Sequence, residues 1–462
     1  MWMSRIIIVR PVSRSVASRR LFHRSSCSAT RSRTSTDAIL RGNERSITLD
    51  DHAVAKVDVS QLAANRPVED FFAASKCLSS NAHLFGVFDG HGGASCARHV
   101  STRLFDYICA SVLEKHTLAQ IPLNERIQHL FSSADPRLPS FIRDIHEFNV
   151  REFHERFRRR EDMTTVRKAL QYAFTRLDSD ICNGALPDSR GQVCRMSVNV
   201  ATSGSCAIIT HIRRGHLHVA NSGDCAAVLG VVNHGHLVAR QLSKPHTIDN
   251  IDETNRVRSQ HPVSERATVL KGGRLLGELY PLRAFGDVRY KWQMELQKVV
   301  LEPLGMSPPS GLQTPPYLTA QPEVFYHKLT PNDKFLVIAS DGLWEWLDPD
   351  TIVRLVSDHA LGTQTLSNYQ PSPEKTLGEI VEEIDRRRKG TVKKPLDDNS
   401  ATHIIRNALG GCSGGTDQQY SRLQDSLQLP PGMARNYRDD ITVIVVHFND
   451  AYLQVNADAD EG

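Results

Sequence analysis

Residues 204–242 contain the feature that most limits the possible folds, because apolar runs follow one another there with only short turns between them. The stretch reads GSCAIITHIRRGHLHVANSGDCAAVLGVVNHGHLVARQL, and pairs such as Arg214-Gly215 and His234-Gly235 separate its runs. Runs rich in valine and isoleucine between glycine turns are typical of consecutive β-strands. Strands joined by tight turns pair antiparallel, since a parallel pair needs a long crossover. The sequence therefore predicts antiparallel sheet.

Other segments of the chain predict helices and further strands. Residues 94–116 and 164–182 carry apolar residues at helical spacing, whereas KFLVIASDG and DDITVIVVHF are short runs rich in valine and isoleucine. A sheet with an apolar face has to bury it against another layer. We therefore predict the α+β class, as a four-layer α-β-β-α sandwich in which two antiparallel β-sheets are flanked by helices.

The chain is expected to hold one catalytic domain, at residues 46–449. Charged or proline-rich stretches predict surface insertions in it near 117–162, 298–316 and 362–398. Residues 450–462 are rich in aspartate, and we expect them to form a disordered acidic tail. No apolar run approaches the length needed to cross a bilayer, so no transmembrane segment is expected.

The first 45 residues differ in composition from the rest. Eight arginines, and no lysine or acidic residue, occur before Asp37. This composition is typical of a mitochondrial transit peptide, so we predict that residues 1–45 are a transit peptide and disordered leader. A basic arm that binds nucleic acid is the alternative. Because the whole chain has a formal net charge of +4, the part after the leader is acidic, which argues against a nucleic-acid partner.

Nine cysteines are present, an odd number, and none of them forms a C-x-x-C pair. This usage fits buried thiols in a reducing compartment better than a disulfide framework or a zinc site.

Acidic residues stand at the boundaries of several apolar runs. One such residue alone is most often part of a turn, because Asp-Gly is a common loop dipeptide. Several of them together would repel one another and lose hydration unless a positive group lay among them. The residues concerned are Asp89 after LFGVF, Asp341 after FLVIAS, Asp287 after Phe285-Gly286, Asp439 before an apolar run, and the pair Glu69-Asp70.

A set of oxygen ligands without a histidine or cysteine cluster suits Mg²⁺ or Mn²⁺. The carbonyl of Gly90 could add a ligand next to Asp89. Two ions sharing a carboxylate would lower the pKa of a bound water and hold a phosphoryl oxygen. His91, two residues from Asp89, would then be placed to protonate a leaving group.

The motifs GVFDGHGG, SGD, FGD, ASDGLWE and RDDITVIVV, in this order, resemble the metal-dependent type 2C family of Ser/Thr protein phosphatases. The resemblance covers about residues 60–448. It implies a β-sandwich between helical layers, with two Mg²⁺ or Mn²⁺ ions at one edge of the sandwich. It also implies that metal-bound hydroxide attacks the phosphorus of phosphoserine or phosphothreonine directly.

The resemblance implies a role for each residue that matches a family motif. Asp89 resembles the bridging metal ligand and Gly90 the carbonyl ligand, and His91 takes the role of general acid. The remaining positions are Asp341 and Asp439 as metal ligands, Glu69 or Asp70 acting through water, and Asp287 and Glu345 at a third, weaker metal.

Two positions depart from the general pattern of the family. Where the family has an arginine that holds the substrate phosphate, this chain has Asn65, with Arg66 beside it. Which arginine takes over the phosphate is left open, and Asn65 and Arg66 are the candidates for phosphate binding. Asp440 stands where the family commonly has asparagine, which adds negative charge near the metals.

Longer stretches, including QLAANRPVEDFFAASKCL and YPLRAFGDVRYKW, are similar to the pyruvate dehydrogenase phosphatase branch of this family. This similarity implies an enzyme of the mitochondrial matrix that dephosphorylates serine on the decarboxylase component of the pyruvate dehydrogenase complex and so reactivates it. It suggests as a partner a lipoyl domain of the acetyltransferase core. The alternatives are a phosphatase for another matrix phosphoprotein and a catalytically dead scaffold of the same fold.

Overall fold

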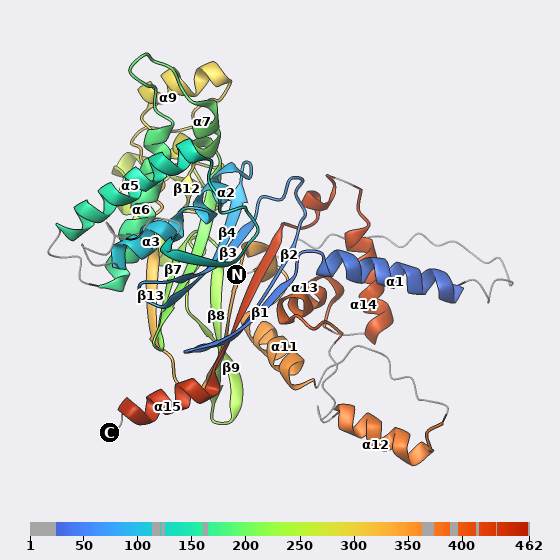
Figure 1. The fold of residues 1–462 in the computed structure, drawn as a ribbon. Coiled ribbons are helices and arrows are strands. Elements are labelled where there is room, and N and C mark those ends of the chain that lie inside the picture. The colour runs from blue at the N-terminus through green and yellow to red at the C-terminus, as the bar shows by residue number, and fades with distance from the viewer. Residues whose placement is uncertain are drawn as a thin grey trace, which may run out of the picture.

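The computed structural model describes residues 25–112, 121, 125–159, 165–362, 374–388, 396–412, 415–430 and 432–460. Figure 1 shows two sheets at the centre, with helices α2, α3, α5 and α6 on one side and α1, α11, α13 and α14 on the other. All strand pairs in both sheets are antiparallel. The predicted four-layer α+β sandwich is therefore confirmed.

The first sheet contains six strands from both ends and the middle of the chain. Its order is β1 (Arg45–Asp51), β2 (Val54–Leu62), β15 (Ile441–Phe448), β14 (Asp333–Ala339), β8 (Ala226–Asn233) and β9 (His236–Gln241). The second sheet has the order β13 (Glu323–Lys328), β7 (His216–Ser222), β6 (Gly204–Arg213), β4 (Ala82–His91), β3 (Phe71–Cys77) and β5 (Ile127–Ser132), and the short β12 (Phe285–Gly286) pairs with β6.

The run at residues 204–242 forms four antiparallel strands, as predicted, but they are divided between the two sheets. β6 and β7 pair in the second sheet, and β8 and β9 pair in the first. The chain therefore passes from one sheet to the other between Ser222 and Ala226.

Strand β15 shows why several central strands are apolar throughout. Ile444 and Val446 belong to the core between the two sheets, whereas Val443 and Val445 pack in the core beneath the helices. Successive side chains of a strand point to opposite faces, so a strand covered on both faces is apolar at every position.

Helices on each outer face complete the layers. The second sheet is covered by α2 (Ser95–Ser101), α3 (Leu104–Val112), α5 (Ser140–Arg158), α6 (Val166–Gly184) and α7 (Arg195–Thr202). The first sheet is covered by α10 (Asp341–Trp344), α11 (Pro349–Leu361), α13 (Ser400–Gly410) and α14 (Gly415–Leu427), with α1 (Ser25–Arg41) beside them. The predicted helix at 94–116 is divided into α2 and α3, and residues 113–116 lie outside the described residues.

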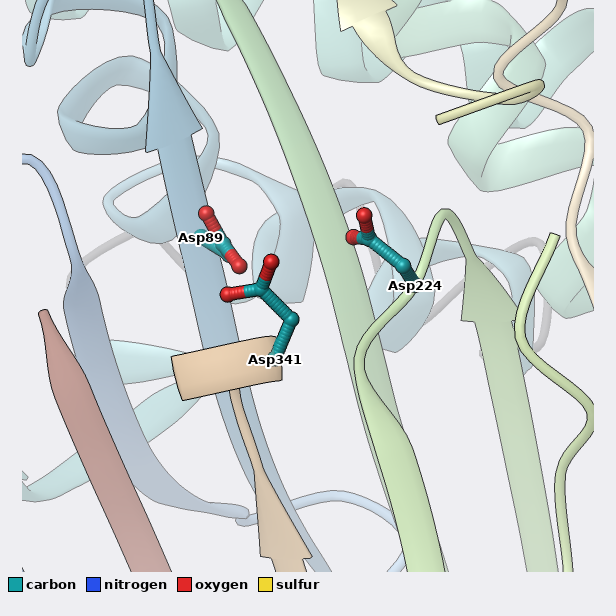
Figure 2. Close-up of side chains that lie close together, drawn as sticks. All are labelled: Asp89, Asp224 and Asp341. Carbon is teal, nitrogen blue, oxygen red and sulfur yellow. The ribbon is translucent and has the colours of Figure 1, made fainter. Parts of the chain in front are cut away.

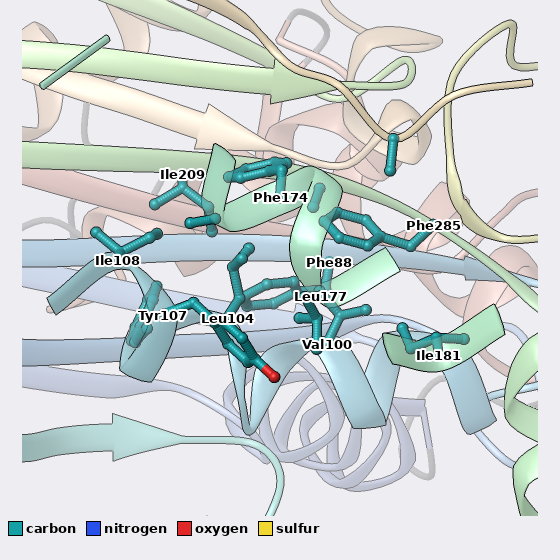
Figure 3. Close-up of a cluster of buried hydrophobic side chains, with 14 of the residues drawn as sticks. Phe88, Val100, Leu104, Tyr107, Ile108, Phe174, Leu177, Ile181, Ile209 and Phe285 are labelled. Carbon is teal, nitrogen blue, oxygen red and sulfur yellow. The ribbon is translucent and has the colours of Figure 1, made fainter. Parts of the chain in front are cut away.

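The core under α3 and α6 fixes the strand that carries the predicted metal ligand. Figure 3 shows Phe88 of β4 among Leu104 and Leu177 from these two helices. Phe174 of α6 and Phe285 of β12 have ring centroids 5.3 Å apart. Phe88, next to Asp89, is fully buried, so the end of β4 is held by packing.

Residues 251–318 form a lobe with a small core of its own, which includes Val257, Leu282 and Tyr317. Its elements are α8 (Ile251–Ser259), η2 (Val263–Glu265), β10 (Leu270–Lys271), β11 (Arg274–Leu275), η3 (Val288–Tyr290), α9 (Met294–Val300) and η4 (Glu302–Leu304). The predicted insertion at 298–316 lies within this lobe.

The predicted insertion at 117–162 is more than a surface feature. Its β5 extends the second sheet, and Phe153 of its helix α5 is fully buried. Within 362–398, the described part contains α12 (Leu377–Arg388). Residues 117–120, 122–124, 160–162, 363–373 and 389–395 of these insertions lie outside the described residues.

The prediction of a disordered acidic tail is wrong for Asp450–Asp460, which form helix α15. Leu453 is 3% exposed and packs into the core between the sheets, and the Asn449 side chain accepts a hydrogen bond from the Tyr452 N–H. A buried leucine, a capping residue and the ion pair of Asp450 with Lys334 therefore tie this acidic segment to the domain. Residues 461–462 lie outside the described residues.

The predicted disordered leader is likewise wrong for Ser25–Arg41, which form helix α1. Leu40 is fully buried, and the Asp37 carboxylate lies 2.8 Å from Arg406 of α13. Residues 1–24 of the predicted transit peptide lie outside the described residues. In the part of the chain that is described, no helix combines the length and apolar character needed to span a membrane.

Candidate metal centre

Three aspartates meet at one edge of the sandwich. Asp89 lies near the end of β4, Asp224 follows β7, and Asp341 begins α10 directly after β14 and Ser340. One carboxylate oxygen from each lies within 4.8 Å of the other two. Figure 2 shows their carboxylates turned toward a common space. Because β4 and β7 belong to the second sheet and β14 to the first, both sheets contribute to this group.

The group is crowded with negative charge. Burial, followed by repulsion from Asp341, raises the pKa of Asp89 well above its usual range. The pKa of Asp341 is raised in the same way by burial and then by Asp224. Burial also raises the pKa of Asp224. A cation placed among these carboxylates would offset the repulsion.

Two buried carboxylate oxygens in this region have no hydrogen-bond partner among the described residues, Asp70 Oδ2 and Asp224 Oδ1. Asp70 is 2% exposed, and its pKa is raised to about 8 by burial and by Asp440. A buried polar atom without a partner costs free energy unless a ligand satisfies it. The oxygen-only donor set and its unsatisfied atoms therefore fit a hard divalent cation.

Gly90 allows the loop before β3 to approach this edge. A Cβ atom at Gly90 would lie 2.3 Å from the backbone oxygen of Glu69, so any side chain there would displace the loop. Glu69 itself is half-buried, and burial and then Asp440 raise its pKa. The Glu69-Asp70 pair, predicted to act through water, thus lies beside the Asp89 strand.

Asp439 and Asp440 have different environments. Asp439 lies outside the group of three, and its carboxylate pairs with Arg435 at 2.6 Å. Its charge still contributes to the raised pKa values of Asp89 and Asp341.

Asp440 is 1% exposed, and its carboxylate accepts hydrogen bonds from the backbone N–H groups of Ala64, Asn65 and Glu69. In the sequence we interpreted it as additional charge near the metals. In the structure, its contacts hold the loop that carries Glu69 and Asp70.

His91 and Asp287 form a close pair at the same edge, with His91 Nε2 2.6 Å from Asp287 Oδ2. Burial alone would lower the pKa of His91, but the Asp287 carboxylate outweighs it, and the pKa is raised. Gly204 makes room for the pair, because a Cβ there would lie 2.0 Å from His91 Nε2 and 2.2 Å from Asp287 Oδ2. Protonation of His91 is thus favoured at the end of β4, two residues after Asp89.

The residues suggested for a third metal are not brought into one group. Asp287 contacts His91, whereas Glu345 is exposed and lies one turn after Asp341, whose carbonyl accepts its N–H at 3.2 Å. In the described residues, only Asp89, Asp224 and Asp341 form a group of three or more metal-ligating side chains.

The two candidates for phosphate binding differ in whether their side chains are free to contact a substrate. The Asn65 side-chain amide donates to Asp440 Oδ2 at 3.1 Å and to Asp439 Oδ1 at 3.4 Å, so the aspartates hold it. Arg66 is exposed beside it.

Asp224 was not among the predicted site residues, although its motif SGD was one of those that carried the family resemblance. The signal was the one that identified Asp89, an acid beside a glycine at the end of an apolar run. What the sequence did not reveal is that this turn carries the chain from one sheet to the other.

Comparison with known proteins gives a consistent picture. The profile of the Protein phosphatase 2C family matches residues 111–387. The human mitochondrial [pyruvate dehydrogenase [acetyl-transferring]]-phosphatase 2 is 39% identical over 423 residues, which is 86% of this chain and 78% of that protein. The human mitochondrial phosphatase 1 of the same name is 38% identical over 89% of this chain and 82% of its own length. A protein phosphatase 2C homolog of Schizosaccharomyces pombe is 32% identical over 90% of this chain and 85% of its own.

Proposed function

Because the chain belongs to the protein phosphatase 2C family, whose members are metal-dependent protein serine/threonine phosphatases, we propose that it acts on phosphoserine of the decarboxylase component of the pyruvate dehydrogenase complex. Hydrolysis there would reactivate the complex. The observation that carries this substrate is the identity of 39% over 86% of the chain with a phosphatase named for pyruvate dehydrogenase. The protein is mitochondrial, as these relatives are, and the matrix is the compartment proposed.

The proposed site contains two Mg²⁺ or Mn²⁺ ions. Asp89, the Gly90 carbonyl, Asp341 and Asp439 would hold them, with Glu69 or Asp70 acting through water. The support is the convergence of Asp89, Asp224 and Asp341, together with the unsatisfied oxygen of Asp70. Bound ions would lower the pKa of a coordinated water and neutralise charge on the phosphoryl oxygens.

His91 is the proposed general acid, and it would hold a proton for the departing serine oxygen. Its Nε2 lies 2.6 Å from Asp287, a contact that raises the pKa of the imidazole and fixes its orientation. Arg66, exposed beside the acidic loop, remains a candidate for contact with the substrate phosphate.

The activity is tested with the purified protein and the phosphorylated decarboxylase component, titrated with Mg²⁺ and Mn²⁺. We expect phosphate release that requires the metal and exceeds release from other mitochondrial phosphoproteins. Release from another phosphoprotein alone would support the alternative matrix substrate, and no release from any would support a scaffold without activity.

The ligand assignment is tested by Asp89→Asn and Asp341→Asn. Each should lower kcat by more than about 100-fold, since even partners of metal ligands cost 10- to 100-fold when lost. Asp252→Asn, on the exposed surface of α8, is the control and should keep normal turnover. Near-normal activity of either site variant would refute its assignment as a metal ligand.

We further propose that a lipoyl domain of the acetyltransferase core binds the protein. The support is the basic end of α5, where Arg151, Arg156 and Arg159 are exposed and could meet an acidic surface. An isolated lipoyl domain should bind the wild-type protein and bind Arg151→Glu/Arg156→Glu about tenfold more weakly. Equal binding to both proteins would contradict this surface.

A further inference from the structure

A cavity of about 680 Å³ lies between the 251–318 lobe and the body of the sandwich. Helix α6 and the start of β13 form one wall, and α8 with the segment before β12 forms the other. The volume is in the range of small-molecule sites in proteins. The residues that decide its chemistry are Arg167, Arg256, Arg283, Tyr317, Gln321 and Glu323.

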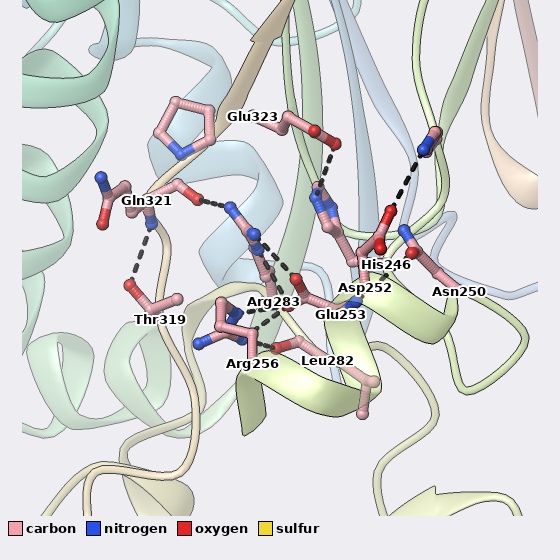
Figure 4. Close-up of polar contacts among 12 residues, drawn as sticks. His246, Asn250, Asp252, Glu253, Arg256, Leu282, Arg283, Thr319, Gln321 and Glu323 are labelled. Carbon is pink, nitrogen blue, oxygen red and sulfur yellow. Dashed lines mark hydrogen bonds and ion pairs between the residues drawn. The ribbon is translucent and has the colours of Figure 1, made fainter. Parts of the chain in front are cut away.

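Two of the three arginines are held in place by one buried carboxylate. Glu253 is 3% exposed and accepts hydrogen bonds from Arg256 Nη2 at 2.6 Å and from Arg283 Nη2 at 2.7 Å. Figure 4 shows both guanidinium groups around this carboxylate. Burial would raise the pKa of Glu253, but the two arginines lower it to about 2, so it stays ionised.

Among the described residues, these contacts leave one N–H donor of Arg256, which uses four on Glu253, Gln260 and the Leu282 carbonyl, and more on Arg283. A guanidinium has five of them, and within the described residues Arg283 uses three, two on Glu253 and one on the Gln321 carbonyl. Arg167 comes from the opposite wall, where it is exposed and donates to the Val324 carbonyl. Against three guanidinium groups, the lining contains one carboxylate, Glu323.

The cavity adjoins the strand end that bears Asp224. Glu323 is paired with Asn221 in the β13–β7 ladder, three residues before Asp224. Behind it, the fully buried His246 accepts the Gly223 N–H at its Nδ1 at 3.1 Å, and its Nε2 lies 3.7 Å from Glu323. The cavity is therefore a neighbour of the metal centre but shares none of its carboxylates.

We propose that this cavity is a second binding site that takes an oxyanion, a carboxylate or a phosphate, between Arg167 on one wall and Arg256 and Arg283 on the other. Guanidinium groups bind both kinds of anion through charge-assisted hydrogen bonds, and the buried Glu253 holds two of the guanidinium groups in place before a ligand arrives. The anion comes either from a free small molecule or from an acidic side chain of a protein bound at the metal centre.

The test measures binding by calorimetry to the full-length protein depleted of metal, which removes the attraction of the catalytic centre for anions. Inorganic phosphate is the probe for a free anion, and tetraglutamate is the probe for an acidic protein segment. We expect at least one to bind, and to bind more weakly in high salt. Binding of phosphate assigns the free anion, and binding of tetraglutamate alone assigns the protein segment.

Substitutions of arginines in the cavity wall test whether the probe binds in the cavity. Arg256→Gln and Arg167→Gln should each weaken the bound probe about tenfold, the usual effect of losing a hydrogen bond to a charged group. Arg258→Gln, on the exposed side of the same helix α8, is the matched control and should bind normally. If Arg256→Gln does not fold, Arg167→Gln decides, because it makes no contact with Glu253.

The inference is overturned if neither probe binds, or if all three variants bind as the wild type does. Because metal-dependent turnover is not measured here, failure of the cavity site is distinguishable from failure of the proposed phosphatase activity.

Discussion

Gly204 shapes the geometry beside the metal centre through what it lacks, a side chain. It starts β6 opposite His91, and the His91–Asp287 pair occupies the volume that a side chain would need. Nothing about a glycine at the start of a strand indicates this role, because glycine there is otherwise interpreted as a turn residue.

We predict that Gly204→Ala separates His91 from Asp287. Its methyl group would lie 2.0 Å from His91 Nε2, so the ring has to move. Phosphate release should fall at least about tenfold, with a loss of about 1–3 kcal/mol in unfolding free energy from overpacking. Steady-state kinetics and urea unfolding measure the two effects.

Gly184→Ala is the matched control, because a Cβ at the end of α6 meets nothing within 4 Å. It should keep full activity. Normal turnover of Gly204→Ala would show that the His91–Asp287 contact is not needed.

At the residue scale, the sequence predicted Asp89 and Asp341 because each ends an apolar run. The end of such a run can be identified from the sequence alone. It missed Asp224, since whether a turn lies at the centre depends on which sheet the next strand joins. It predicted the charge of Asp440 near the centre, but not that this residue also accepts hydrogen bonds from backbone N–H groups about 375 positions away in the chain.

At the scale of elements, helix α1 belongs to the folded domain although its sequence resembles a leader. Its contacts with the domain come from a few positions: Leu40 is fully buried, Asp37 and Arg41 contact Arg406 and Asp397, and Arg33 pairs with Asp417. The average composition of 45 residues does not reveal these few positions. For the same reason, the acidic composition of the last segment did not indicate that Leu453 is buried.

We predict that Leu40→Ala lowers the unfolding free energy by about 2–5 kcal/mol, the cost of removing a buried leucine side chain. Ile39→Ala is the adjacent control, since Ile39 is 44% exposed, and it should change stability by less than about 0.5 kcal/mol. Chemical denaturation measures both. Equal stability of the two variants would mean that α1 does not pack on the domain in solution.

At the scale of the whole molecule, several histidines are buried in the neutral form. Burial, and then His218, lowers the pKa of His211 to about 3. Burial and Arg283 lower that of His246 to about 3, and burial and His359 lower that of His403 to about 4. Unfolding would return each to about 6.5, where the exposed imidazole takes up a proton.

We therefore predict acid destabilisation that begins near pH 6.5. At each of these histidines, the unfolded chain binds more protons than the folded one below this pH, so their contribution to stability falls as pH decreases toward 4. Each group costs up to about 1.4 kcal/mol per pH unit in this window. Urea midpoints at pH 7.5 and pH 5 measure the loss, and His403→Gln should reduce its steepness. A midpoint independent of pH in this range would contradict the prediction.

The architecture was the most predictable level. The antiparallel pairing followed from short turns, and the layers followed from strands that are apolar on both faces. The division of residues 204–242 between two sheets did not, because local turn chemistry is the same whether a turn closes a hairpin or crosses between sheets.

The first sheet joins the two ends of the chain, since β2 near the start lies between β1 and β15, and β15 ends at Phe448. During synthesis, β2 can pair with β1 early, but its other neighbour, β15, emerges only after residue 440. Completion of this sheet is consequently a late event in synthesis, because its central pairing waits for the last strand.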